Sequence, residues 1–353
     1  KPRTSPKSRH VCTYDHTGDR ARADRSAPVR TITDTLMTES IQQKHSVGDP
    51  RCRLSVIIVS WNVQDDLHRC LDSLMTGNRG EGIEVWVVDN ASSDGTVQML
   101  EKRYPQVRLI CNSENRGFAA ANNQGLEAAD AEYYLLLNPD TIVPEGGLQA
   151  LLQFADAHPE AGAIGPQLRN PDGSLQYSAR RFPTITAAIF RNTILGRLFP
   201  GAASPSRYLM TEWDHDDARQ VDWVSGACMM VREEALEQIG YLDEAFFWGS
   251  EDVDFCFRLH KAGWEVWYTP EPRVVHAIGR STSQVVIPTI IRTHRSMRRL
   301  YAKHLARNCF SRAVVSLGIS LRCGLLICSY LTMAGITRVR GLLSGAQRPD
   351  ATG

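Results

Sequence analysis

The feature that most constrains the fold of this chain is a regular alternation of apolar runs and amphipathic segments between residues 54 and 137. The runs at 54–61 (LSVIIVSW), 84–88 (EVWVV), 107–111 and 133–137 are largely apolar, as is typical of strands buried on both faces of a parallel sheet. Segments with helical spacing or small residues separate these runs, at 62–74, 97–104 and 119–129. Strands that alternate with helices predict a doubly wound, mostly parallel α/β sheet with right-handed crossovers.

Polar residues follow four successive strands of this predicted sheet. They are Ser60 and Asn62 after the first strand, Asp89 after the second, Asn115 after the third and Asp140 after the fourth. Turn formation alone favours Asp and Asn at such positions. In open α/β sheets, however, ligands bind outside the carboxyl ends of the strands, so we expect a binding site there. The chain has no GxGxxG after the first strand and no GxxxxGK[ST], which argues against a dinucleotide fold and a Walker-type nucleotide hydrolase.

A second candidate site is the stretch FFWGSEDVDFCFRLH at residues 246–260, where Glu251, Asp252 and Asp254 stand among aromatic residues. Burying an unpaired carboxylate is costly, so these acids are not an ordinary solvated face. Apolar residues recur at helical spacing from Val253, which places Glu251 and Asp252 at a helix N-terminus. The helix dipole stabilises an ionised carboxylate there. From these residues alone, a general base and a simple helix cap remain equal alternatives.

Composition sets broad limits on location and partners. The 353 residues can bury a substantial core, and the formal net charge of +1 gives no reason to expect a nucleic-acid partner. Nine cysteines lie scattered without a metal-binding spacing, which indicates thiols in a reducing compartment. No N-terminal apolar segment of the secretory kind is present, so a cytoplasmic protein is expected.

The two ends of the chain differ from its centre. Residues 1–50 are polar and lack hydrophobic periodicity, so we expect a disordered basic extension before an α/β domain at 51–290. A third segment, 291–353, is basic near HRSMRRLYAKHLARN and then largely apolar over 313–336, with Arg322 near the middle. It could span a bilayer, lie on one or pack as a soluble helix that forms a homodimer. A basic helix before an apolar one suits anionic headgroups, which favours attachment to the membrane surface.

Seven motifs occur in sequence order between residues 54 and 300 and together resemble family 2 glycosyltransferases of the GT-A fold. They are SVIIVSWN, VVDNASSDGT, NRGFAAANNQG, LLLNPDT, SGACMMVR, FFWGSEDVDFCFR and VVHAIGRST. The most similar subgroup is the rhamnosyltransferase-like enzymes that build bacterial cell-surface polysaccharides. The resemblance implies an inverting, metal-dependent transfer of a sugar, with rhamnose favoured, from a dTDP- or UDP-sugar. The implied acceptor is a glycan or a polyprenyl-diphosphate-linked sugar, at the inner face of the cell membrane.

The resemblance also assigns the donor site. Asp89 is expected to accept a hydrogen bond from the imide N–H of thymine or uracil. Asn138-Pro139-Asp140 corresponds to the family's metal-binding DxD motif, with Asn in place of the first acid, so Asp140 is the charged ligand and His276 the second ligand of Mg²⁺ or Mn²⁺. The remaining implied donor-site residues are Ser60, Asn62, Asn115, Gly117, Asn122 and Asn138, with Arg280 beside the leaving diphosphate.

For the acceptor, the resemblance makes Asp252 the general base. Glu251 then orients the acceptor or supports the start of the helix, and Asp254 is structural. The missing first acid of the metal motif favours one alternative, a catalytically silent scaffold subunit of a membrane assembly. The retained set of Asp89, Asp140, Asp252 and His276 favours the enzyme.

Overall fold

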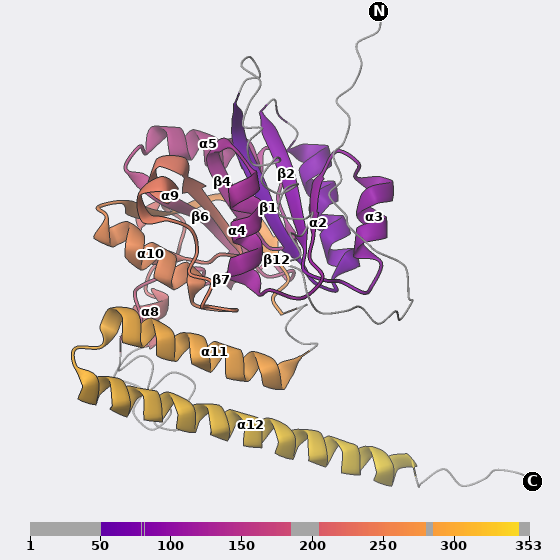
Figure 1. Ribbon diagram of the computed structural model, residues 1–353, viewed down its shortest axis with the longest axis vertical. Helices are drawn as coiled ribbons and strands as arrows, with labels where there is room; N and C mark the ends of the chain where they lie inside the picture. Colours follow the sequence, from indigo (N-terminus) through magenta and orange to yellow (C-terminus); the bar gives the residue numbers. More distant parts are fainter. Residues whose placement is uncertain (1–50, 79, 81, 185–204, 280–284, 346–353) are drawn as a thin grey trace, which may run out of the picture.

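The structure is a computed structural model that describes residues 51–78, 80, 82–184, 205–279 and 285–345. The extension predicted at 1–50 lies outside the described residues. Within the described part, an α/β domain carries a pair of C-terminal helices along one side (Figure 1).

The domain is built on one large mixed sheet, as the alternating pattern predicts. Its order is β3 (Arg108–Cys111), β2 (Ile83–Asp89), β1 (Cys52–Ser60), β4 (Ala131–Leu137), β11 (Cys228–Arg232), β6 (Ala161–Arg169), β12 (Glu265–His276) and β5 (Thr141–Ile142). The short strands β7 (Leu175–Gln176) and β9 (Arg219–Gln220) pair with β6 and β12. The β1–β2, β1–β4, β2–β3 and β6–β12 pairs are parallel, and β11 runs antiparallel to both its neighbours.

Helices cover both faces of this sheet. One layer contains α2 (Gln64–Gly77), α3 (Thr96–Arg103) and α5 (Gly147–Ala157), and the other contains α4 (Phe118–Ala128), α9 (Glu233–Ile239) and α10 (Glu251–Lys261). Alternate residues of β1 face the two layers, with Val56 and Ile58 in the first core and Ile57 in the second. Each fully buried side chain of this kind stabilises the fold by roughly 1.5–3 kcal/mol.

A smaller element flanks the second layer. It consists of a two-stranded sheet, β8 (Ala179–Arg180) with β10 (Trp223–Val224), and the short helix α8 (Pro205–Leu209). In β10, Trp223 is buried and its indole N–H donates to the carbonyl of Arg181. This element closes the side of the domain next to α10.

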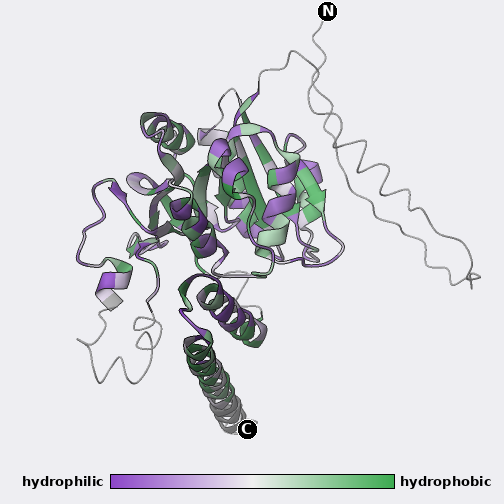
Figure 2. Ribbon diagram, turned by 60° about the vertical axis from the view of Figure 1, so that its left-hand side comes forward, coloured by the Kyte–Doolittle hydropathy of each residue, from purple (hydrophilic) through white to green (hydrophobic). Residues whose placement is uncertain are grey.

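The C-terminal helices form an antiparallel pair. The first, α11 (Val286–Leu300), ends in a π-helical turn, η2 (Tyr301–Leu305), and the second, α12 (Cys309–Gly345), runs back along it (Figure 1). The predicted domain boundary after residue 290 falls inside α11. Figure 2 shows that α11 carries both hydrophilic and hydrophobic residues, whereas α12 is largely hydrophobic.

Candidate functional site

A cavity of about 210 Å³ lies where the carboxyl ends of β1, β2, β4 and β12 meet α4, α11 and the loop before α10. Its lining residues are Val59, Trp61, Asn90, Asn115, Gly117, Phe118, Asn138, Pro139, Asp140, Phe247, Trp248, His276, Ile278, Gly279, Val285, Thr289 and Arg292. Residues at the carboxyl ends of four strands thus line the same cavity, as expected for an open α/β sheet. The predicted residues that line it are Asn115, Gly117, Asn138, Asp140 and His276.

Asp140 and His276 form a close pair in this cavity. The sheet brings them together, because β12 pairs with β5 so that His276 lies opposite Thr141. His276 Nε2 is 3.3 Å from Asp140 Oδ1 and 3.3 Å from Asn138 Nδ2, and both members of the pair are largely buried. This arrangement directs one nitrogen and one carboxylate oxygen at the same point.

Gln176 fixes which nitrogen of His276 faces Asp140. Its Nε2 donates to the carbonyl oxygens of His276, at 2.6 Å, and of the Asn170 side chain, at 2.8 Å, which determines the orientation of the amide. Gln176 Oε1 therefore accepts from His276 Nδ1, at 3.0 Å, and Nδ1 carries a proton. His276 Nε2 therefore faces Asp140 Oδ1 at 3.3 Å, and these two atoms are the pair that could share a cation.

A network of amides shapes the wall next to this pair. Asn90 Nδ2 donates to Asn115 Oδ1, at 3.1 Å, and to the carbonyl of Gly117, at 3.2 Å, while Asn90 Oδ1 accepts from the backbone N–H of Arg116. Asn115 Oδ1 also accepts from the backbone N–H of Gly117. The β2–α3 loop is thereby joined to the start of α4. Asn90 was not among the predicted residues, although it lies in the DNASSDGT motif.

Gly117 is required by the close approach of the loop before α10. Its φ is +90°, and a Cβ there would lie 2.6 Å from the carbonyl oxygen of Phe247. The same oxygen accepts from the backbone N–H of Phe118, at 2.8 Å. No other residue type fits this position without a shift of the loop, so Gly117 couples the start of α4 to the loop that enters α10.

Ser60, Asn62 and Asp89 lie just outside the cavity lining. Ser60 and Asp89 are in register on β1 and β2, and Ser60 Oγ and Asp89 Oδ1 are both buried without a hydrogen-bond partner among the described residues. Asp89 Oδ2 accepts from the N–H of Ser92, and burial raises the pKa of Asp89 despite that bond. Asn62 Oδ1 accepts from the N–H of Ser93, so it joins the β1–α2 and β2–α3 loops. A buried carboxylate oxygen without a donor is suited to receive one from a ligand.

Two further residues predicted for the donor site do not line the cavity. Asn122 is buried and its side chain donates to the carbonyl of Phe118, one turn earlier in α4, so it supports the helix rather than the cavity wall. Arg280 lies outside the described residues.

The acids at the start of α10 differ in their hydrogen bonds. Asp252 accepts hydrogen bonds from the backbone N–H groups of Gly226, at 3.1 Å, and of Val253, at 2.8 Å. The bond from Val253 is made at the start of α10, as expected for a residue that supports the helix N-terminus. Glu251 is buried, and its Oε2 has no partner among the described residues. Burial raises the pKa of both groups, and the charge of Asp252 raises that of Glu251 further. Because only Asp252 receives donated hydrogen bonds at both oxygens, the charge of this pair resides on Asp252.

Asp254 is fully buried and binds three basic side chains. Lys303 Nζ lies 2.7 Å from its Oδ1, His304 Nε2 lies 2.6 Å from the same oxygen, and Arg258 Nε lies 3.0 Å from Oδ2. Lys261 Nζ lies 3.2 Å from His304 Nδ1, and burial lowers the pKa of His304, so a neutral ring donates its Nε2–H to Asp254. The geometry fits the structural role expected for Asp254.

Asp243, in the loop before α10, makes a second link to the C-terminal helices. Arg299 Nη2 and Lys303 Nζ lie 3.0 Å and 2.8 Å from its Oδ2, and they lower the pKa of Asp243 to about 2. Ser296 of α11 also donates to the carbonyl of Trp248, at 3.1 Å. These contacts hold α11 against the segment that carries the candidate base.

Comparison with known proteins identifies the family. Residues 55–240 match the family model described as glycosyl transferase family 2. The chain belongs to this family. Over 254 residues it is 35% identical to the N-acetylglucosaminyl-diphospho-decaprenol L-rhamnosyltransferase of Mycobacterium tuberculosis, an alignment that covers 69% of this chain and 82% of that protein. The predicted family and its rhamnosyltransferase-like subgroup are confirmed, and the protein is a glycosyltransferase.

Two further similarities concern the subgroup and the fold. The chain is 28% identical over 229 residues to the rhamnosyltransferase WbbL of Escherichia coli, covering 63% of this chain and 82% of that protein. A solved structure of GalNAc-T7 with UDP, GalNAc and Mn²⁺ superposes with a TM-score of 0.50 at 14% identity, covering 75% of this chain and 53% of that one. At that identity the likeness concerns the fold alone.

Proposed function

We propose that this glycosyltransferase moves rhamnose, with inversion, from a pyrimidine nucleoside diphosphate to a sugar carried by a polyprenyl diphosphate. The support for the substrates is the 35% identity to a relative named for rhamnose transfer to a decaprenyl-diphosphate-linked sugar. The support for the reaction is the single cavity that joins Asp140 and His276 to the loop entering α10.

Asp89 is the proposed contact to the base. Its Oδ1 is buried without a donor, and the imide N–H of thymine or uracil supplies one donor. Thymine and uracil both carry this imide N–H. Asp89 therefore selects for either of these bases and does not distinguish one from the other. Thymidine diphosphate rhamnose is the proposed donor.

Asp140 Oδ1 and His276 Nε2 are the proposed protein ligands of Mg²⁺ or Mn²⁺. Their donor atoms fit such a cation, and the nitrogen ligand favours Mn²⁺. The described residues hold no cluster of three or more His, Cys, Asp or Glu suited to a metal, so the donor diphosphate and water would fill the other positions. When bound, the cation neutralises charge on the leaving diphosphate.

Asp252 is the proposed general base. It takes the proton of the acceptor hydroxyl while that oxygen forms a bond to the anomeric carbon of the donor. The bond from this carbon to the diphosphate breaks, the nucleoside diphosphate leaves, and a single displacement inverts the configuration. The raised pKa of Glu251 and the two hydrogen bonds donated to Asp252 favour Asp252 as the ionised member of the pair. Phe247 and Trp248 provide the apolar wall that limits water.

Calorimetric titration of dTDP, UDP and GDP, with and without Mn²⁺, tests the donor half. We expect Mn²⁺-dependent binding of dTDP and UDP, weak binding of GDP, and loss of the Mn²⁺ dependence in Asp140→Ala. Transfer of labelled rhamnose to a polyprenyl-diphosphate-linked acceptor tests the full reaction. Folded protein that binds no nucleotide would contradict the proposal.

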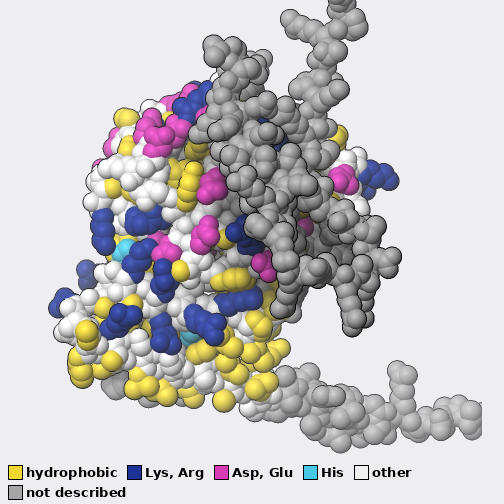
Figure 3. Space-filling model, viewed as in Figure 1, with side chains coloured by type: hydrophobic (Ala, Val, Ile, Leu, Met, Phe, Trp, Pro, Cys, Tyr) yellow, Lys and Arg dark blue, Asp and Glu magenta, His cyan; other side chains and the backbone are white. Residues whose placement is uncertain are grey.

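We also propose that α12 lies on the membrane surface at the cytoplasmic face. Over Cys309–Met333 it is the one helix of the described chain long and apolar enough to cross a bilayer. Phe310, Val314, Leu317, Leu321 and Leu325 recur at helical spacing, and each is more than half exposed. Figure 3 shows hydrophobic side chains gathered over α12, below a band of basic side chains over α11. An apolar stripe beside a basic band suits a helix in the headgroup region.

The position of Arg322 favours this orientation over a span. Arg322 is partly buried and its Nε is a buried atom, whereas the stripe is exposed, so Arg322 lies on the side of α12 that packs toward α11. Sedimentation with phosphatidylcholine vesicles, with and without phosphatidylglycerol, tests the proposal on Leu317→Asp/Leu321→Asp. We expect vesicle binding to fall while nucleotide binding persists. If the substitutions instead split a dimer and leave vesicle binding intact, the stripe is a homodimer interface.

A further inference from the structure

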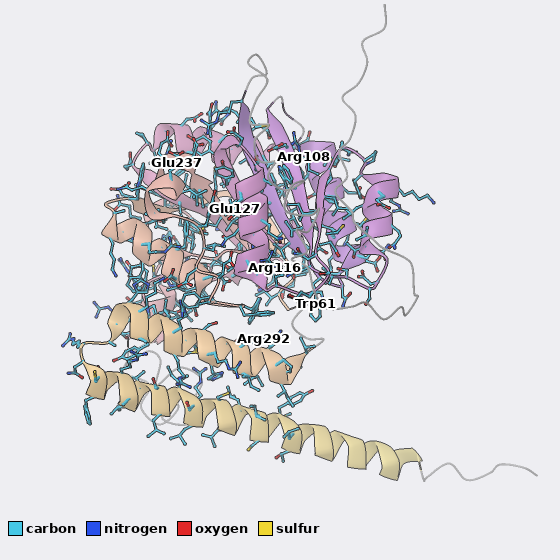
Figure 4. The ribbon with its side chains drawn as sticks, viewed as in Figure 1. Trp61, Arg108, Arg116, Glu127, Glu237 and Arg292 are labelled. Carbon is cyan, nitrogen blue, oxygen red and sulfur yellow. The ribbon has the colours of Figure 1, made fainter. Side chains whose placement is uncertain are left out.

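Arg292 brings a positive charge to the wall of the cavity from α11. Its guanidinium carbon lies 4.0 Å from the centroid of the Phe247 ring, and it lines the same cavity as Asp140 and His276. In Figure 4, Arg292 lies on α11 next to the end of the sheet that carries Trp61, which also lines the cavity. The stacked ring holds the guanidinium in place.

Two basic side chains of α10 and α11 are paired with carboxylates, in contrast to Arg292 among the residues that the structure describes. Arg299 pairs with Asp243, and Arg258 pairs with Asp254. No hydrogen bond or ion pair joins Arg292 to any residue in the part of the chain that the structure describes, yet its side chain is only partly exposed. A partly buried cation held by an aromatic ring alone is suited to an anionic ligand.

The rest of the lining narrows the class of anion. Asp140 is the one carboxylate among the lining residues, and it is engaged with His276. The lining also contains the apolar or aromatic side chains of Phe247, Trp248 and Val285, and the Phe247 ring contacts Arg292. A planar guanidinium fork matches the geometry of phosphate oxygens and binds them through paired hydrogen bonds.

We propose that Arg292 binds a diphosphate group in this cavity, from the wall formed by α11. This inference rests on the proposed function, which supplies two sources of that chemistry. One is the diphosphate of the nucleotide donor, and the other is the diphosphate that joins the acceptor sugar to its lipid. The helix that carries Arg292 also carries the basic band next to α12, so an acceptor held in the membrane would reach the cavity along α11.

Steady-state kinetics in neutral detergent micelles tests the inference with three variants. Arg292→Met keeps the aliphatic contact with Phe247 and removes the charge, and Arg292→Lys keeps the charge without the fork. Arg298→Met removes one charge from an exposed position six residues further along α11 and is the matched control. We expect Arg292→Met to raise one KM roughly 10- to 100-fold, with kcat changed far less, and Arg292→Lys to recover part of that loss.

The KM that rises, together with calorimetry of dTDP, identifies the source. A higher KM for the acceptor with unchanged dTDP binding assigns Arg292 to the acceptor diphosphate. A higher KM for the donor with weaker dTDP binding in the same ratio assigns it to the donor. If neither KM changes, or if Arg298→Met has an equal effect, the inference is wrong although wild-type transfer still supports the proposed function. If the wild type transfers nothing from these substrates, both are wrong.

Discussion

The proposed active site has two regions, called here the donor end and the acceptor end, which are held together by different kinds of interaction. At the donor end, formed by β1, β2, β4 and the start of α4, neutral amides and backbone groups make the contacts, as in the network of Asn90, Asn115 and Gly117. At the acceptor end, around the start of α10, buried charges make them, and their partners lie about 50 residues away in the sequence, as between Asp254 and Lys303. The first kind is local to strand ends, whereas the second exists only after α11 and η2 have docked.

This difference has an energetic consequence. A neutral hydrogen bond contributes about 0.5–1.5 kcal/mol net, so the donor end should tolerate the loss of a single amide contact. Removing one partner of a buried ion pair costs about 3–5 kcal/mol, because the remaining charge stays buried. Substitutions at the acceptor end should therefore affect folding and catalysis together.

The largest expected effect is that of Asp252→Asn on turnover. A positioned general base contributes roughly 10²- to 10⁴-fold, so kcat should fall by that factor while dTDP binding, a property of the donor end, persists. Glu251→Gln is the matched control because Gln imitates the protonated acid. It should lower kcat far less, and an equal loss in both variants would place the charge on Glu251 instead. Rapid-quench kinetics and calorimetry measure the two properties.

Asp254→Asn should cause the largest loss of stability, about 3–5 kcal/mol, because it leaves Lys303 and Arg258 without their buried carboxylate. Denaturant unfolding measures this loss. Asp243 also pairs with Lys303, but its side chain is 19% exposed. Asp243→Asn should therefore lower the free energy of unfolding much less than Asp254→Asn does. Equal losses in the two variants would show that burial does not set the strength of these contacts.

Gly117→Ala tests the point where the two ends touch. The added Cβ must displace the carbonyl of Phe247, so both dTDP binding and kcat should fall. Gly146→Ala is the control, since Gly146 also has a positive φ, of +71°, and a Cβ there meets nothing within 4 Å. Both substitutions carry the backbone strain of about 1–2 kcal/mol, so the excess loss in Gly117→Ala measures the coupling between the ends. No excess loss would mean that the loop before α10 moves freely.

Residues at the strand ends were easier to locate from the sequence than residues brought in by distant contacts, for the same physical reason. Continuous apolar runs mark buried strands, and the polar residues after them must lie at one edge of the sheet, so Asn115 and Asp140 could be found by pattern. Asn122 shares that pattern but bonds within its own helix, which its spacing does not reveal. Gln176 and Arg292 reach the cavity through contacts distant in sequence, from a short edge strand and a docked helix. No local pattern encodes such contacts.

The smallest expected effect is on the pH dependence of stability and of kcat. It also gives the sharpest comparison between Glu251 and Asp252. Burial raises both pKa values, so the folded chain keeps these protons to higher pH than the unfolded chain does. Their contribution to the free energy of unfolding is therefore fully present at low pH and is lost as pH rises through the folded pKa values. Turnover changes in the opposite direction, because the base must be ionised, so the acid limb of kcat should lie above the ordinary Asp range near pH 4. Glu251→Gln should keep this limb if Asp252 is the base, and its disappearance would assign the limb to Glu251.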